Sequence, residues 1–190
     1  MTTMPKVATT PRLLKAEALL RPEYEGPHEL WDGVLMVRDA CGFDADSVAA
    51  TISALLFAHV SRRKLGRVSG SSGGFVLARG PDRVLVPDVA FVATDRLKII
   101  VPGKFAEGPP DLAVEVRSPS DSWISVVRKT GIWLAHGTKV VWAVDPEARI
   151  VVVSRGIDLP PETLTTKDTL DGAPVLPKFR VKVARLFSGL

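Results

Sequence analysis

Cysteine and histidine are scarce in this chain of 190 residues, which has one cysteine, Cys41, and three histidines. One cysteine cannot form a disulfide within the chain, and we therefore expect the reducing conditions of a cytoplasmic location. Cys41 is interpreted as a loop residue rather than a catalytic thiol. The histidines have no spacing typical of metal ligands. Neither a disulfide scaffold nor a histidine-based metal centre is indicated.

The chain also lacks a long hydrophobic run. Although 46% of its residues are hydrophobic, the longest apolar stretches, such as that in residues 139–144, have the length of a strand, whereas a bilayer-spanning helix needs about 20 residues. Residues 1–11 have too little apolar length for the core of a signal peptide. We expect no membrane association. The net charge of +4 permits a nucleic-acid partner but does not require one.

The length suits one sizeable core, so we expect an N-terminal extension with a short helix over residues 1–22 and a single domain over residues 23–190. Apolar periodicity predicts further helices at residues 46–64 and 122–135. Strands are expected at residues 67–77, 83–92, 112–116, 138–144 and 149–154. Asp32-Gly33 between two strand-like halves predicts a β-hairpin. The pattern indicates an α/β (α+β) fold, a mixed β-sheet flanked by helices, with a strand–helix–strand crossover after residue 112.

Two carboxylates interrupt apolar strands. Asp88 opens the strand that ends near residue 92, and Glu115 lies in the middle of the strand at residues 112–116. A charge in an apolar strand costs roughly several kcal/mol unless it is paired or binds a metal. Strand alternation places Glu115 and Arg117 on the same face of the sheet. Two adjacent carboxylates therefore suggest a cation between them.

Asp88, Glu115 and a nearby cation are the groups required for metal-assisted hydrolysis of a phosphodiester. Carboxylate oxygens bind Mg²⁺, and a lysine or arginine stabilises negative charge in the transition state. Arg117 lies on the correct face of the strand, and Lys129 lies at the edge of the apolar arc of the helix at residues 122–135. The residue types alone equally allow a network of ion pairs that closes the end of the sheet.

A series of short motifs, in this order along the chain, resembles the Uma-two family of restriction-endonuclease-like proteins, within the PD-(D/E)xK nuclease superfamily. The motifs are Glu29-Leu-Trp-Asp-Gly-Val-Leu, Pro87-Asp-Val-Ala-Phe-Val, Gly108-Pro-Pro-Asp-Leu-Ala-Val-Glu-Val-Arg-Ser-Pro-Ser-Asp, Lys129, Gly137, Trp142-Ala-Val-Asp-Pro and Leu176-Pro-Lys-Phe. Each motif alone is weak. Their order over nearly the whole chain, from about residue 24 to residue 187, makes the resemblance specific.

The resemblance implies a restriction-endonuclease-like core with extra β-hairpins. It implies Asp88 and Glu115 as ligands of Mg²⁺ or Mn²⁺, Glu29 as a supporting acidic residue, and Lys129 as the family's lysine, moved from the strand to the following helix. Arg117 occupies the strand position where the superfamily has its lysine. Arginine cannot act as a base and spreads its charge over a larger group than an ammonium does.

The expected function is that of a Mg²⁺-dependent DNA endonuclease, which hydrolyses phosphodiester bonds. DNA is the expected partner, and a homodimer is compatible with the sequence. Clustered cations at residues 62–67 indicate that any binding of nucleic acid is mainly electrostatic. Two alternatives stay open: a catalytically impaired nucleic-acid-binding or assembly protein that retains the nuclease fold, and a metal-dependent hydrolase of a small phosphodiester.

Overall fold

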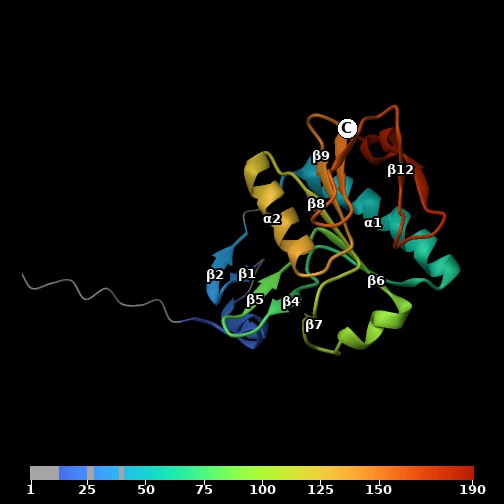
Figure 1. Cartoon of the computed structure of the whole chain (residues 1–190). Coiled ribbons are helices and arrows are strands. Elements are labelled where there is room, and N and C mark those ends of the chain that lie inside the picture. The colour runs from blue at the N-terminus through green and yellow to red at the C-terminus, as the bar shows by residue number, and fades with distance from the viewer. Residues whose placement is uncertain (1–12, 25–27, 39–40) are drawn as a thin grey trace, which may run out of the picture.

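The structure is a computed structural model of the chain and describes residues 13–24, 28–38 and 41–190. In this part of the chain two α-helices and four short 3₁₀ helices accompany three β-sheets (Figure 1). The helices are α1 (Phe43–Arg63), α2 (Trp123–Ala135), η1 (Ala16–Leu20), η2 (Pro22–Tyr24), η3 (Thr94–Ile99) and η4 (Val183–Phe187).

The sheets are mixed and differ in size. The six-stranded sheet has the order β11 (Glu162–Leu164), β10 (Ile150–Ser154), β9 (Val140–Asp145), β8 (Leu112–Val116), β6 (Val89–Ala93) and β3 (Gly66–Ser69). The five-stranded sheet has the order β2 (Val34–Val37), β1 (His28–Trp31), β5 (Arg83–Leu85), β4 (Phe75–Ala78) and β7 (Ala106–Glu107). A small third sheet pairs β12 (Thr169–Asp171) with β13 (Arg180–Lys182).

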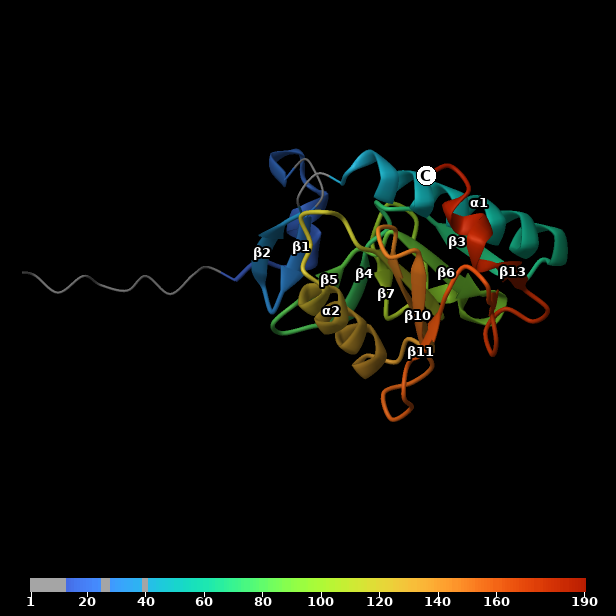
Figure 2. The ribbon, with the colours of Figure 1, turned by 90° about the horizontal axis from the view of Figure 1, so that it is seen from above.

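The six-stranded sheet separates two layers, with α1 on one side and α2 on the other (Figure 2). Leu112, Val114 and Val116 of β8 belong to the core that packs on α1. Ala113 of the same strand belongs to a second core that contains Trp133 of α2, together with side chains of the five-stranded sheet. Both faces of β8 are therefore buried, as expected for a strand in the middle of a layered α/β structure.

The predicted crossover is confirmed, because β8 and β9 are parallel neighbours joined through α2. The predicted hairpin is also confirmed. Its strands β1 and β2 are antiparallel, and Asp32 and Gly33 both have positive φ, 54° and 80°, as a type I′ turn requires. The helix expected at residues 122–135 begins at Trp123, after Ser122, whose hydroxyl accepts the N–H of Ser125.

The strands expected at residues 67–77 and 83–92 are wrong as single strands, because each is divided between the two large sheets. The first divides into β3 and β4, and the second into β5 and β6. A glycine-rich segment leads the chain from β3 in one sheet to β4 in the other. Gly74 in this segment lies close to Phe105, and a Cβ on Gly74 would lie 2.5 Å from the Phe105 ring. Pro87, which lacks an N–H for a strand ladder, lies at the second passage, from β5 to β6. This second passage places Asp88 immediately before β6.

Two helix boundaries differ from those expected. α1 begins at Phe43 rather than at residue 46, so Asp44 and Asp46 lie in its first turn, where they face the positive end of the helix dipole. Of the short helix expected within residues 1–22, the structure shows the 3₁₀ helix η1 at Ala16–Leu20. Residues 1–12 of this extension lie outside the described residues.

Among the described residues, α1 is the one helix long and apolar enough to cross a membrane, judged by length and composition only. This is weak evidence, because a core helix passes the same test. One face of α1, including Val48, Ile52 and Leu56, is buried in the core beside the six-stranded sheet. We therefore interpret α1 as a core helix.

Asp111, directly before β8, connects three strands of the six-stranded sheet. Its fully buried carboxylate accepts the N–H of Ala93 at 2.9 Å and lies 3.2 Å from Arg96 and 2.9 Å from Lys139. Burial alone would raise the pKa of Asp111, but this backbone N–H and the two cations hold it below its usual value. The stabilisation is therefore present at neutral pH and is lost only as the pH falls below about 4.

We predict that Asp111→Asn lowers the free energy of unfolding at pH 7 by about 1.5–3 kcal/mol, the scale of a hydrogen bond to a charged group. Urea denaturation measures this. Asp32→Asn is the control, because Asp32 pairs with Arg83 on the surface and an exposed pair contributes about 0–1 kcal/mol. Equal effects of the two substitutions would contradict the role given to Asp111.

Candidate active site

Four of the five predicted site residues line one pocket of about 430 Å³. Glu29 comes from β1, Asp88 from the segment before β6, Glu115 from β8 and Lys129 from α2. The pocket thus lies where the two large sheets meet the side of α2. Residues separated by a hundred positions in the sequence are brought together by the passage of the chain between the sheets.

Asp88 lies beside Glu115 because of the strand register. Val89 pairs with Val114 in the antiparallel β6–β8 ladder, so the register continued by one residue sets Asp88 opposite Glu115. The N–H of Asp88 donates to the carbonyl of Val114, and Asp88 Oδ2 accepts the N–H of Val116 at 2.7 Å. The edge of the sheet therefore fixes one oxygen of this carboxylate.

Glu115 is buried, with both oxygens occupied. Oε1 accepts the indole N–H of Trp133 at 2.7 Å, and Oε2 lies 3.0 Å from Lys129 Nζ. Burial raises the pKa of Glu115 to about 7, with Asp88 and Glu29 adding to the rise, although Lys129 and the Trp133 hydrogen bond act in the opposite direction. Glu115 is the group whose charge this site accommodates least well.

Lys129 connects the two glutamates. Its Nζ lies 2.8 Å from Glu29 Oε1 and donates to the carbonyl of Val86 at 2.9 Å. Burial alone would lower the pKa of Lys129, but Glu115 and Glu29 raise it above its usual value, so the side chain is an ammonium at neutral pH. A buried charge held in this way is a compact cation fixed beside Glu115.

Glu29 is held by three donors from three directions. Besides Lys129, its carboxylate accepts the N–H of Val86 at 2.9 Å and the indole N–H of Trp31 at 3.1 Å. Burial alone would raise the pKa of Glu29, but these donors, with Lys129 first among them, hold it below its usual value. At pH 7 Glu29 is therefore ionised, whereas its neighbour Glu115 is only partly ionised.

Arg117, the fifth predicted residue, does not line the pocket. Its guanidinium forms a fork with Asp145, with Nε to Oδ2 at 2.9 Å and Nη2 to Oδ1 at 3.1 Å, and also binds Glu147. The parallel ladder explains this, because Val116 pairs with Val144 and the next residues along, Arg117 and Asp145, lie side by side. Arg117 lies on the predicted face of the sheet. Its side chain, however, turns toward β9, whereas Asp88 lies beside the opposite edge of β8.

A divalent metal fits the donor set that Asp88 and Glu115 offer. No group of three or more His, Cys, Asp or Glu side chains in the described ranges is arranged to hold a metal. Mg²⁺, however, is usually bound through one or two carboxylates and keeps several waters. Two carboxylates on adjacent strands, beside an open pocket that admits water, meet this requirement.

Comparison with protein families gives one match over most of the chain. The model of the Uma2 family, described as "Putative restriction endonuclease", matches residues 16–184. The chain belongs to the Uma2 family. The predicted resemblance is thereby confirmed. No curated protein matches the sequence significantly.

A solved structure shares the fold of this Uma2 chain. It is the crystal structure of a protein described as a putative nuclease belonging to DUF820 from Anabaena variabilis ATCC 29413. The TM-score is 0.77 at 21% sequence identity, and the match covers 90% of this chain and 96% of the other. At this identity the likeness establishes the fold, and it confirms the predicted mixed α/β class.

The Uma2 pocket contains residues that the sequence did not indicate. Arg38, directly after β2, places Nη2 2.8 Å from Asp88 Oδ1. The guanidinium of Arg128 lies 4.5 Å from the centre of the Trp31 ring, and both residues line the pocket. Trp133, which donates to Glu115, lies beside the pocket and not in its lining. Its position four residues after Lys129, on the same side of α2, is the signal that could have linked it to Glu115.

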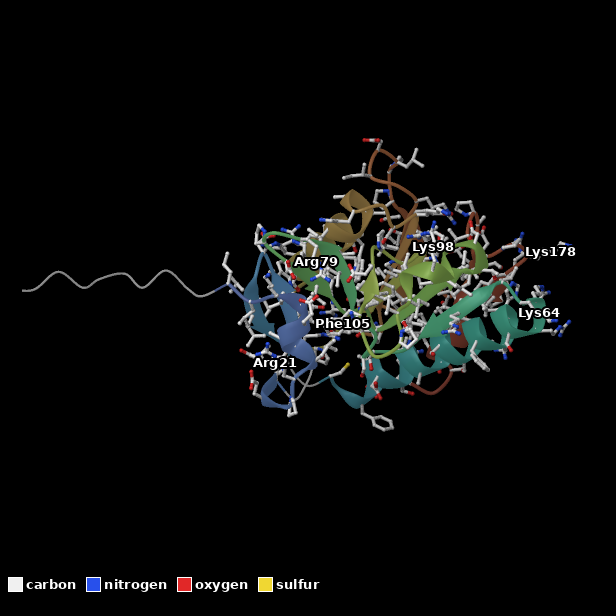
Figure 3. All side chains as sticks on the ribbon, turned by 90° about the horizontal axis from the view of Figure 1, so that it is seen from below. Arg21, Lys64, Arg79, Lys98, Phe105 and Lys178 are labelled. Atoms are coloured by element: carbon white, nitrogen blue, oxygen red, sulfur yellow. The ribbon has the colours of Figure 1, made fainter. Side chains whose placement is uncertain are left out.

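The basic cluster at residues 62–67 lies at the other end of α1 from the pocket. Cys41, just before α1, lines the pocket, and the 21 residues of the helix span about 30 Å. Lys64 and Lys178 project at this distant end (Figure 3). These cations cannot contact the same nucleotide as the pocket, where Arg38, Arg128 and Lys129 are the lining cations.

The raised pKa of Glu115 predicts a pH-dependent stability in the absence of metal. Between the unfolded value of 4.5 and about 7 the folded protein holds more protons than the unfolded chain. The free energy of unfolding should therefore fall as the pH rises through this window, by about 3 kcal/mol at most. The measurement is urea denaturation from pH 4.5 to pH 8.

Glu115→Gln should remove this component, so the difference from wild type isolates it from other titrating groups. Glu162→Gln, an exposed glutamate paired with Arg155, should keep the wild-type slope. If the stability of Glu115→Gln has the same pH dependence as that of wild type, the Glu115 carboxylate is ionised throughout this pH range. The raised pKa assigned to Glu115 would then be wrong.

Proposed function

We propose that this Uma2 protein is a metal-dependent nuclease that hydrolyses phosphodiester bonds of DNA, with Mg²⁺ or Mn²⁺ as the cofactor. One observation carries the proposal: Asp88, directly before β6, is held against β8 beside Glu115, and a buried lysine is held 3.0 Å from Glu115. Two carboxylates with one fixed ammonium are what metal-assisted phosphodiester hydrolysis requires.

Five residues in or beside the pocket have separate roles. Asp88 and Glu115 would hold the metal, which lowers the pKa of a bound water and stabilises charge on the attacked phosphate. Lys129 places a compact positive charge beside the reacting phosphate. Glu29 keeps Lys129 charged and fixes its position. Trp133 orients Glu115 through its indole N–H.

The family description and the neighbour's title support the nuclease part of this proposal. The family is described as "Putative restriction endonuclease", and the neighbour in structure is described as "a putative nuclease". The open pocket, lined by Arg38, Arg128 and Lys129, suits an anionic substrate. Arg128, exposed and stacked on Trp31, is placed to meet a phosphate that arrives from solvent.

One observation favours the alternative of a nucleic-acid-binding or assembly protein without catalysis. Asp88 already has a cation partner, Arg38, at 2.8 Å. A protein that kept this ion pair permanently would retain the fold and the pocket but bind no metal. Metal-dependent cleavage of DNA by the wild-type protein separates the two functions.

We predict that Mn²⁺ binds at a site that requires both carboxylates. Isothermal calorimetry on the wild-type protein should show binding, and Asp88→Asn and Glu115→Gln should each abolish it. Asp171→Asn and Glu162→Gln are matched controls, because these two carboxylates share Arg155 outside the pocket. Unchanged Mn²⁺ binding in both site variants would exclude the proposed ligands.

We predict that Lys129 is needed for cleavage and Arg117 for stability. Lys129→Met should lower the rate of metal-dependent cleavage of plasmid DNA by about 10²- to 10³-fold, the effect of removing one preorganised donor. Arg117→Met should still cleave at close to the wild-type rate but should melt at a lower temperature, since it loses the Asp145 fork.

Thermal melting of each variant shows whether the loss of cleavage is a loss of folding. A folded, inactive Arg117→Met variant beside an active Lys129→Met variant would reverse the two assignments. A wild-type protein that binds Mn²⁺ but cleaves no DNA would favour the non-catalytic alternative.

A further inference from the structure

Arg38 covers the oxygen of Asp88 that the sheet leaves available. Oδ2 of Asp88 accepts the N–H of Val116, whereas Oδ1 faces the guanidinium of Arg38 at 2.8 Å. A second, long hydrogen bond of 3.4 Å joins Arg38 Nη1 to the carbonyl of Ser71. The Arg38 side chain lines the pocket and is 23% exposed.

We infer that Arg38 occupies the cation position at Asp88, that a divalent ion displaces it, and that the released guanidinium then contacts a phosphate of the substrate. This inference rests on the proposed function, because it concerns the same metal and the same substrate. It assigns to Arg38 an exchange between two anionic partners, first the carboxylate of Asp88 and then a phosphate.

Displacement follows from the distances around Oδ1. A Mg²⁺ ion binds its oxygen ligands at about 2.0–2.1 Å, and Arg38 Nη2 lies 2.8 Å from the same oxygen. An ion bound to Oδ1 would therefore lie no more than about 5 Å from the guanidinium. Two cations so close, in a partly buried pocket, repel each other strongly.

The carboxylates of the site are what hold Arg38 in place. Burial alone would lower the pKa of Arg38, but Asp88, Glu29 and Glu115 raise it above its usual value. A divalent ion placed among these carboxylates would weaken the field that attracts the guanidinium. Among the described residues, the Arg38 side chain makes one further hydrogen bond besides that to Asp88, the long one to Ser71.

A phosphate is the chemically suited second partner. The guanidinium presents a planar fork of donors that matches phosphate oxygens in two-point contacts. Arg38 lines the pocket together with Lys129 and Arg128, so a phosphodiester bound near Asp88 would lie within reach of the released side chain. The exchange would couple metal arrival to substrate binding.

The first test is the Mn²⁺ affinity of Arg38→Met, measured by isothermal calorimetry beside wild type. Methionine keeps the length of the stem and removes the charge. We expect Mn²⁺ to bind about tenfold more tightly or better, because the competing cation is gone. The matched control is Arg83→Met: Arg83 is 21% exposed, pairs with Asp32 and does not line the pocket, so its affinity should equal that of wild type.

Unchanged or weaker Mn²⁺ binding by Arg38→Met would overturn the inference, since an arginine that only orients Asp88 would give that result. Binding by Arg38→Met in the absence of any binding by wild type would support it, and absence of binding in both would overturn it. Thermal melting confirms that the variants are folded.

The second test measures the phosphate contact by fluorescence anisotropy of a short labelled DNA duplex, with Ca²⁺ in place of Mn²⁺ to avoid cleavage. Arg38→Met should bind the duplex more weakly, with a salt dependence lower by about 0.9, the contribution of one phosphate contact. An unchanged salt dependence would exclude the phosphate contact. Loss of cleavage alone concerns the proposed nuclease function, whereas these two binding measurements concern Arg38 whether or not the protein cleaves DNA.

Discussion

Lys129 lies between two buried glutamates that belong to different sheets, and the arrangement of the pocket depends on this interaction. Glu29 comes from the five-stranded sheet and Glu115 from the six-stranded sheet, whereas Lys129 comes from α2. The lysine also binds the carbonyl of Val86, at the point where the chain passes between the sheets. One ammonium thus joins both large sheets to α2, and its removal would leave two buried carboxylates without their shared cation.

Among the described residues, the interacting charges of the site do not balance in the absence of metal. Three carboxylates, Glu29, Asp88 and Glu115, interact with two cations, Lys129 and Arg38. The imbalance falls on Glu115, whose pKa burial raises to about 7. Such a cluster opposes folding stability, and groups with perturbed pKa values in a pocket are typical of functional sites. A bound divalent ion would remove the conflict.

The sequence predicted the elements with local signals and failed where the fold is decided at long range. The Asp32-Gly33 turn and the apolar periodicity of residues 122–135 are local signals, so the hairpin and α2 followed from them. The division of residues 67–77 and 83–92 between two sheets depends on tertiary packing, which periodicity does not report. Asp88, Glu115 and Lys129 stood out because charges interrupt apolar patterns. Arg38 carried no such signal, since it follows a strand with exposed residues.

The most direct test of this metal site is a crystal structure of the wild-type protein soaked with Mn²⁺ and recorded at an anomalous wavelength. We predict one anomalous peak between Asp88 and Glu115, with Arg38 turned away from Asp88 and Lys129 still between the two glutamates. A peak elsewhere, or no peak while Arg38 stays on Asp88, would contradict the assignment of this pocket as a metal-dependent active site.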